Sequence, residues 1–76
     1  MEKEILNYYQ NFAKNIKIER LAKGMTQKQV AEKLGIKTQS YQAYENGLCM
    51  PTAENLLKLS IIFSCSLDEL FEMKNS

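Results

Sequence analysis

The segment from Thr26 to Gly47, TQKQVAEKLGIKTQSYQAYENG, constrains the fold of this chain more than any other. Its apolar residues recur at three- and four-residue intervals on both sides of Gly35, which predicts two short helices joined by a tight turn. The spacing brings Ala31 close to the second helix, where a larger side chain would push the two helices apart. Gly35 stands where the first helix must end, and glycine readily adopts the left-handed conformation of a helix C-cap. The expected buried positions are Val30, Ala31, Leu34, Ile36, Tyr41 and Tyr44.

Two helices in this arrangement form a helix-turn-helix, a unit that places its second helix in the major groove of DNA. The net charge of +1 conceals a polarised chain. Residues 12–37 carry seven basic and two acidic side chains, a balance of +5, whereas residues 38–76 have a balance of −3 and residues 1–11 of −1. A basic surface attracts the phosphate backbone even when the whole molecule is nearly neutral. By themselves, the lysines could equally well form a helix face that contacts only water. The adjacent helix-turn-helix motif favours DNA binding as their role.

The pattern of apolar residues predicts an all-α fold, a compact five-helix bundle without strands. Capping boxes are expected where Thr26 precedes Gln29 and where Ser66 precedes Glu69. In the first helix, apolar residues from Ile5 to Ile16 form one stripe, and in the last helix Leu67, Leu70 and Phe71 are expected to pack inward. The predicted helices run from Glu4 or Tyr9 to Lys23, from Thr26 to Leu34, from Lys37 or Thr38 to Gly47, from Thr52 through Phe63, and from Ser66 onward.

Length and composition describe one small domain. A chain of 76 residues buries only about 60% of the surface that its unfolded form exposes, so oligomerisation would add stability. No apolar run approaches the roughly 20 residues of a membrane span, and the charged first ten residues do not resemble a secretory signal. We therefore expect a cytoplasmic, nucleoid-associated protein that does not bind membranes.

The two cysteines and the lack of histidine argue against metal and redox chemistry. Without histidine or a CxxC pair, a tetrahedral zinc site lacks its usual ligands. Cys65 is expected in the core, among Ile61, Ile62, Phe63 and Leu67. Cys49 is expected in an exposed loop, where a redox switch would require a lowered thiol pKa that the sequence does not indicate. We expect no metal and no cofactor.

Four segments, in this order and spacing, resemble one known family: MTQKQVAEKLGI, SYQAYENG, P-T-x-x-x-L-x-K-L and SLDELF. The chain is similar to the Xre family, the phage repressor and Cro type of helix-turn-helix domain found in the lambda and 434 repressors. The similarity extends from about Phe12 to Phe71. It implies a DNA-binding domain over residues 12–72, an N-terminal extension over residues 1–11 and a C-terminal tail over residues 73–76. It also implies a homodimer that binds an inverted repeat in double-stranded DNA and regulates transcription, most simply as a repressor.

The resemblance assigns roles to individual residues. Gln27 opens the first helix of the motif, where the family holds a phosphate with the help of the helix N-terminus. Gln39 occupies a base-reading position, and glutamine suits adenine N6 and N7. Ala43 would offer its methyl group to a thymine methyl. The expected base contacts are Thr38, Gln39, Gln42 and Ala43, with a phosphate as the alternative for Gln42, and the expected phosphate contacts are Gln27, Lys28, Lys37, Ser40 and Asn46.

Arg20 and Glu45 match family positions that form a structural ion pair between the first and third helices, and we predict that pair here. Tyr41 and Tyr44 fall on the face opposite the bases, so core packing is favoured for both. The alternative for Tyr44 is a hydroxyl that reaches a phosphate.

Three departures from the family pattern leave alternatives open. Lys37 replaces the usual Ser or Thr cap of the recognition helix, which costs about 0.5–2 kcal/mol but adds a cation beside DNA; Thr38 is an alternative cap. Leu48 replaces a common basic residue, so the Leu48–Met50 loop is a candidate partner surface. The N-terminal extension either lengthens the first helix and covers the core, which we favour, or dimerises. The region from Leu59 to Phe71 is a third candidate dimer surface.

Two other function classes are weighed against the DNA-binding regulator. A protein-protein adaptor or antitoxin-like module would use the same fold, and the uncharged loop at residues 48–51 leaves room for it. An enzyme is disfavoured, because no glycine-rich phosphate loop and no nucleophile-base pair is present, and so small a domain has little room for a substrate cleft. We therefore predict no catalytic residues.

Overall fold

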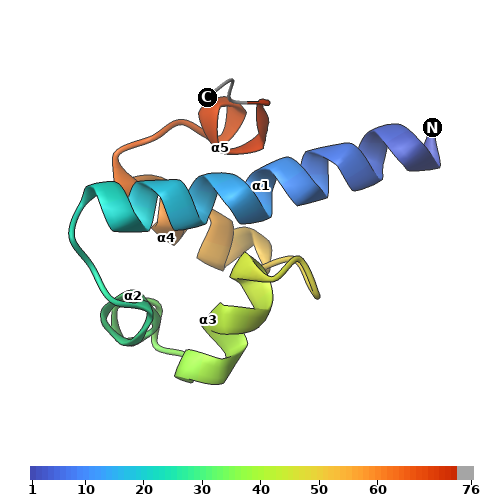
Figure 1. The fold of residues 1–76 in the computed structure, drawn as a ribbon. Coiled ribbons are helices and arrows are strands. Elements are labelled where there is room, and N and C mark those ends of the chain that lie inside the picture. The colour runs from blue at the N-terminus through green and yellow to red at the C-terminus, as the bar shows by residue number, and fades with distance from the viewer. Residues whose placement is uncertain (74–76) are drawn as a thin grey trace.

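The computed structural model describes residues 1–73, and these form five helices without a strand (Figure 1). The all-α, five-helix prediction is therefore confirmed. Residues 74–76, most of the predicted C-terminal tail, lie outside the described part of the chain. The helices are α1 (Glu2–Ala22), α2 (Gln27–Leu34), α3 (Thr38–Glu45), α4 (Ala53–Phe63) and α5 (Leu67–Phe71).

The helices surround one small core; α1 packs against α3, α4 and α5, whereas α2 lies below the C-terminal end of α1 and packs against α3 and α4 (Figure 1). Phe12 and Ile16 of α1 are fully buried, and Phe12 stacks on Phe71 of α5 with ring centroids 5.0 Å apart. Asn15, also on α1, is 2% exposed and its side-chain amide donates to backbone oxygens at the end of α5, at 2.9 Å to Leu70 and 2.7 Å to Glu72. One polar side chain of α1 thus holds the last helix in place.

Side-chain caps begin three of the helices. Thr26 and Ser66 form the two expected capping boxes, and Thr52 accepts a hydrogen bond from the backbone of α4. The N-cap of α3 is Lys37, which makes no side-chain cap bond. Thr38 is the first residue inside α3, so the alternative that Thr38 caps this helix is wrong.

The favoured role of the N-terminal extension, covering the core, is also wrong. The extension does lengthen α1, which begins at Glu2, but residues 1–10 are all exposed. The physical reason is visible in Figure 1: the first turns of α1 continue past the edge of the bundle, where no other described helix lies beneath them.

Burial at the C-terminal side follows the prediction only in part. Cys65 is buried and Cys49 exposed, as expected. Leu70 is fully buried, as predicted. Leu67 is 37% exposed, so the prediction that Leu67 packs inward is wrong. Because α5 has only five residues, it presents little more than one turn to the core. Ile61, expected near Cys65, is 77% exposed.

Candidate nucleic-acid interface

The pair α2 and α3 has the geometry of a helix-turn-helix. Gly35 ends α2 in the left-handed conformation with φ 73°, and the backbone N–H of Ile36 donates to the Ala31 carbonyl at 3.0 Å. Ala31 is 1% exposed, so a side chain larger than its methyl group has no space there. A residue other than glycine at position 35 would be strained, since L side chains rarely adopt this conformation.

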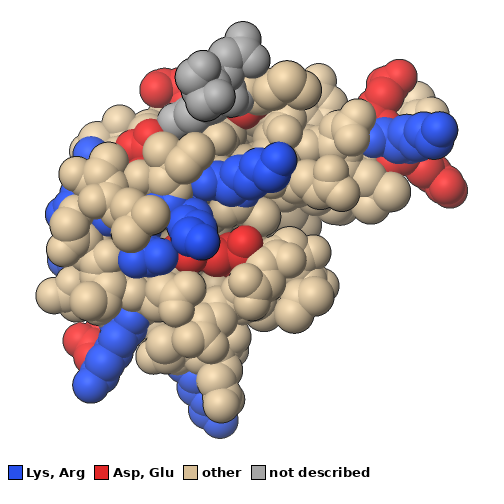
Figure 2. Space-filling model, in the orientation of Figure 1, with Lys and Arg blue, Asp and Glu red and all other residues tan. Residues whose placement is uncertain are grey.

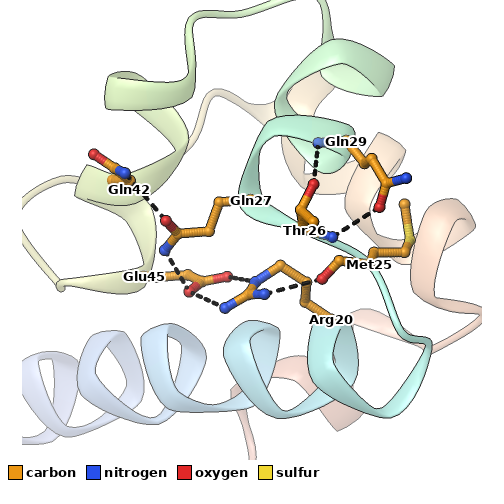
Figure 3. A network of polar contacts seen from close by, with 7 residues as sticks. All are labelled: Arg20, Met25, Thr26, Gln27, Gln29, Gln42 and Glu45. Atoms are coloured by element: carbon orange, nitrogen blue, oxygen red, sulfur yellow. Dashed lines mark hydrogen bonds and ion pairs between the residues drawn. The ribbon is translucent and has the colours of Figure 1, made fainter.

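A buried ion pair joins α1 to the end of α3 (Figure 3). Arg20 Nε lies 2.6 Å from Glu45 Oε2, and Arg20 Nη2 donates to Glu45 Oε1 at 3.2 Å. The remaining guanidinium nitrogen, Nη1, donates to the Met25 carbonyl at 3.0 Å. The two side chains are 10% and 2% exposed. Bidentate contact of this kind fixes the relative direction of the two helices as well as their distance.

The pair shifts the pKa of both groups. Burial by itself raises the pKa of Glu45, but the hydrogen bond from Arg20, the nearby hydroxyl of Tyr41 and the amide of Gln27 together outweigh burial, so the net pKa lies below its usual value. The hydrogen bond to Glu45 raises the pKa of Arg20, against the lowering effect of burial. Both groups are therefore charged at neutral pH.

A chain of hydrogen bonds extends from this ion pair to the exposed side of α3 (Figure 3). Gln27 Nε2 donates to Glu45 Oε1 at 3.1 Å, and Gln42 Nε2 donates to Gln27 Oε1 at 3.1 Å. An ionised carboxylate only accepts, so the Gln27 amide must turn its nitrogen toward Glu45 and its oxygen toward Gln42. Sequence reasoning missed this link, because spacing alone does not reveal which amide groups meet across two helices.

The tyrosines of α3 belong to the core. Tyr41 is fully buried and Tyr44 is 8% exposed, in agreement with the favoured interpretation of both. The hydroxyl of Tyr44 accepts a hydrogen bond from Asn55 at 3.2 Å. The hydroxyl of Tyr41 is buried without a hydrogen-bond partner in the described part of the chain, and burial raises its pKa.

The expected DNA contacts occupy several places on the motif. Gln39 is exposed at the first turn of α3, and Thr38 and Ala43 are half-buried. Gln27 and Gln42 are half-buried and joined to each other. Asn46 is the C-cap of α3 and lies at the opposite end of this helix from Thr38. The expected phosphate contacts Lys28, Lys37, Ser40 and Asn46 are all exposed.

Basic side chains gather around the motif. Figure 2 shows lysine and arginine over the C-terminal half of α1, over α2 and at the start of α3, whose N-cap is Lys37. The acidic side chains of this view lie toward α5, near the centre, at the lower left over α2, and at the N-terminal end of α1, where a basic side chain lies among them. The surface that surrounds the start of α3 therefore has the charge that phosphate contacts require.

Neither a metal site nor a membrane span was found in the part of the chain that the structure describes. No group of three or more His, Cys, Asp or Glu side chains among residues 1–73 is arranged to hold a metal ion. None of the described helices has the length and apolar character to cross a membrane.

Comparison with known proteins identifies the motif. The helix-turn-helix family matches residues 16–70. The phage CTXphi transcriptional repressor RstR of Vibrio cholerae is 44% identical over 52 residues, which are 68% of this chain and 46% of that protein. Two Bacillus subtilis proteins, the HTH-type transcriptional regulator YqaE and the SPbeta prophage-derived regulator YonR, are 41% and 39% identical over 61 residues, or 80% of this chain and 53% and 56% of those proteins. The chain thus spans about half the length of the curated relatives it matches. No solved structure matches it significantly.

Proposed function

The chain belongs to the Xre-like helix-turn-helix family, and we propose that it is a sequence-specific DNA-binding regulator of transcription. In this proposal α3 enters the major groove, and two copies bind an inverted repeat. The family is one of DNA-binding regulators rather than enzymes. The name of the Vibrio cholerae relative, a transcriptional repressor, supports repression as the effect on transcription.

The observation that carries the proposal is the way α3 is held. Its C-terminal residue Glu45 is tied to α1 through Arg20 and to α2 through Gln27, within a network in which each polar contact is 2.6–3.2 Å long. Its first turn, with Gln39, is exposed and carries no hydrogen-bonded cap. A helix anchored at one end and open at the other, on a basic surface, suits insertion into a groove.

The proposed contacts divide into those that read bases and those that hold the backbone. Gln39 is the main base reader, through a bidentate contact with adenine N6 and N7. Thr38, Gln42 and Ala43 are the other proposed base contacts. Lys28, Lys37, Ser40 and Asn46 are proposed phosphate contacts. Gln27 joins them through the second N–H of its side-chain amide, since the first donates to Glu45 and the oxygen accepts from Gln42.

Selection of binding sites from a random duplex library, repeated at two salt concentrations, tests the proposal. We expect an enriched inverted repeat whose half-sites are about 10 bp apart, or a multiple of that spacing. Enrichment must weaken at higher salt, because phosphate contacts release counterions. No enrichment at either salt would contradict DNA recognition and would favour the adaptor or antitoxin-like alternative.

A further inference from the structure

The apolar face of α1 continues beyond the core that it covers. The face repeats after seven residues, which is two helical turns. Over residues 12–16 this face is buried in the bundle. Over residues 5–9 its apolar side chains are 42–56% exposed. The buried residues are Phe12, Ala13, Asn15 and Ile16, and their exposed counterparts are Ile5, Leu6, Tyr8 and Tyr9. A soluble chain rarely leaves such a face bare unless something packs on it.

Two hollows lie along this part of α1, on the side of the loop between α3 and α4. The first has a volume of about 270 Å³ and is lined by Leu6 and Tyr9 of α1 and by Leu48 and Met50 of the loop. The second, of about 410 Å³, extends along α1 to Lys14. Gly47 lines both, so the two hollows are neighbours beside α1, and together they are called the groove.

We propose that this groove holds the N-terminal half of α1 from a second copy of the chain. The two α1 helices pack antiparallel around Leu6 and Tyr9, with Leu48 at the edge. The inference rests on the homodimer of the proposed function and names the surface that forms it. The surface offers both a protruding apolar helix and a groove beside it, which is the self-complementarity that a two-fold interface requires.

The exposed apolar area limits the strength of such a dimer. Ile5, Leu6, Tyr8 and Tyr9 are about half exposed, and Leu48 is 77% exposed. Tyr8 lines a separate hollow beside Glu72, so the groove side offers only roughly 400 Å² per chain and roughly 800 Å² for two copies, below the roughly 1,200 Å² of a standard stable interface. A dimer of modest affinity follows, one that DNA binding at adjacent half-sites would reinforce.

The charges favour the antiparallel direction. When two α1 helices cross near residue 8, the first turn of one lies beside Lys14 of the other. That turn carries Glu2, Lys3 and Glu4, but Glu4 lies on the other side of α1, beside Glu72. The opposite charges that can meet are therefore Glu2 and Lys14, both of which are exposed. Opposite charges meet at both ends of the pair, and the two helix dipoles oppose each other. A parallel arrangement would instead place equal charges at the same level.

The proposed dimer leaves the base-reading start of α3 open, but it covers Asn46, which lines the second hollow and so cannot contact a phosphate while the groove is filled. The groove adjoins the loop after the C-terminal end of α3, whereas Gln39 lies at its N-terminal end (Figure 1). Two copies joined through α1 therefore keep both recognition helices accessible.

Sedimentation equilibrium of the full chain without DNA tests the inference. We expect a concentration-dependent dimer, and Leu6→Glu should raise its dissociation constant at least tenfold. Leu6 is 56% exposed, so this change should leave helix content by circular dichroism unaltered. Ile61→Glu is the matched control, because Ile61 is 77% exposed on α4, outside the proposed interface, and should leave the dissociation constant unchanged.

A charge-reversal series provides a second readout. Lys14→Glu should weaken the dimer, and adding Glu2→Lys should restore it. A chain that stays monomeric throughout its soluble range, or a dimer that Ile61→Glu breaks and Leu6→Glu does not, would overturn the inference. Failure of the two proposals is distinguishable. A dimer without DNA preference refutes the regulator and leaves this interface, whereas a monomer that selects single half-sites refutes this interface and the inverted repeat but leaves sequence-specific DNA recognition.

Discussion

At the scale of single residues, Glu45 makes stability depend on pH. Its folded-state pKa lies below its usual value of 4.5, so its contribution is complete above the unfolded pKa and is lost as pH falls through the folded pKa. We expect the wild type to lose more unfolding free energy between pH 7 and pH 3 than Glu45→Gln does. Urea unfolding at both pH values measures this difference.

The substitution also destabilises at neutral pH, because it leaves Arg20 buried without its counter-charge, which costs about 3 kcal/mol. If Glu45→Gln does not fold, the double variant Arg20→Met, Glu45→Leu replaces it, since apolar substitution of both partners is often tolerated. Equal pH dependence in the wild type and the variant would show that Glu45 is not the titrating group.

Gln39 provides the test of sequence reading by one side chain. It is exposed at the first turn of α3, so its truncation should leave the fold intact. We expect Gln39→Ala to cost about 1–3 kcal/mol on the selected operator and to relax preference at one base pair. Fluorescence anisotropy with the operator and with single-base variants measures both effects. Unchanged affinity and unchanged preference would remove Gln39 from the base contacts.

The residue scale is also where sequence reasoning reached its limit. Arg20 and Glu45 were paired from family positions, and the structure contains their ion pair. The resemblance gives Gln27 and Gln42 separate roles and does not predict the hydrogen bond between them. Helix spacing places a residue on a face, but the partner of a flexible amide depends on rotamers and on neighbouring acceptors such as Glu45.

At the scale of helices, the N-cap residue of α3 affects both the stability of the fold and the binding of DNA. Lys37 is the N-cap without a side-chain cap bond, and serine is among the preferred residues at this position. We expect Lys37→Ser to raise the unfolding free energy by about 0.5–2 kcal/mol and to weaken binding to all DNA sequences alike. Thermal unfolding and binding to operator and random duplexes measure the two effects. A loss restricted to the operator would indicate a base contact instead.

The shortest helix, α5, depends on a residue of the longest. Asn15 donates to the carbonyl groups of Leu70 and Glu72, and five residues are too few for a helix to be stable alone. We expect Asn15→Ala to cost about 1–3 kcal/mol, because it leaves buried acceptors unpaired. Hydrogen exchange over residues 67–72 should increase, and Asn7→Ala, at an exposed position of the same helix, should not change it.

Helix positions followed from the sequence more closely than burial did. Thr26, Gly35 and Ser66 mark helix ends through local hydrogen bonding and backbone conformation, and local patterns reveal such signals. The apolar stripe of α1 misled the prediction, because periodicity shows that a face is apolar but not where the rest of the bundle ends. Ile5 and Tyr9 continue the stripe and are nevertheless 42% exposed.

At the scale of the whole molecule, charge is separated along the chain. Residues 12–37 carry a balance of +5 and residues 38–76 of −3, and the basic part contains α2 and the start of the turn to α3. A DNA duplex that approaches the basic part therefore meets a positive electrostatic potential, although the net charge of the protein is close to zero. The electrostatic attraction of DNA is strongest on the face that presents α3. The field therefore guides DNA toward the same face whose helix enters the major groove.

This separation predicts how binding responds to salt. The logarithm of the association constant should fall linearly with the logarithm of salt concentration, with a slope of about −0.9 for each phosphate neutralised. Lys28→Ala should make the slope shallower by about one, and the loss of affinity should be equal on operator and random DNA. Lys58→Ala is the control, because Lys58 lies on α4 and pairs with Glu54 at 3.2 Å, so the slope should not change. Equal slopes for wild type and Lys28→Ala would mean that Lys28 does not contact the DNA backbone. A slope near zero for the wild type would mean that the basic face binds a partner other than DNA.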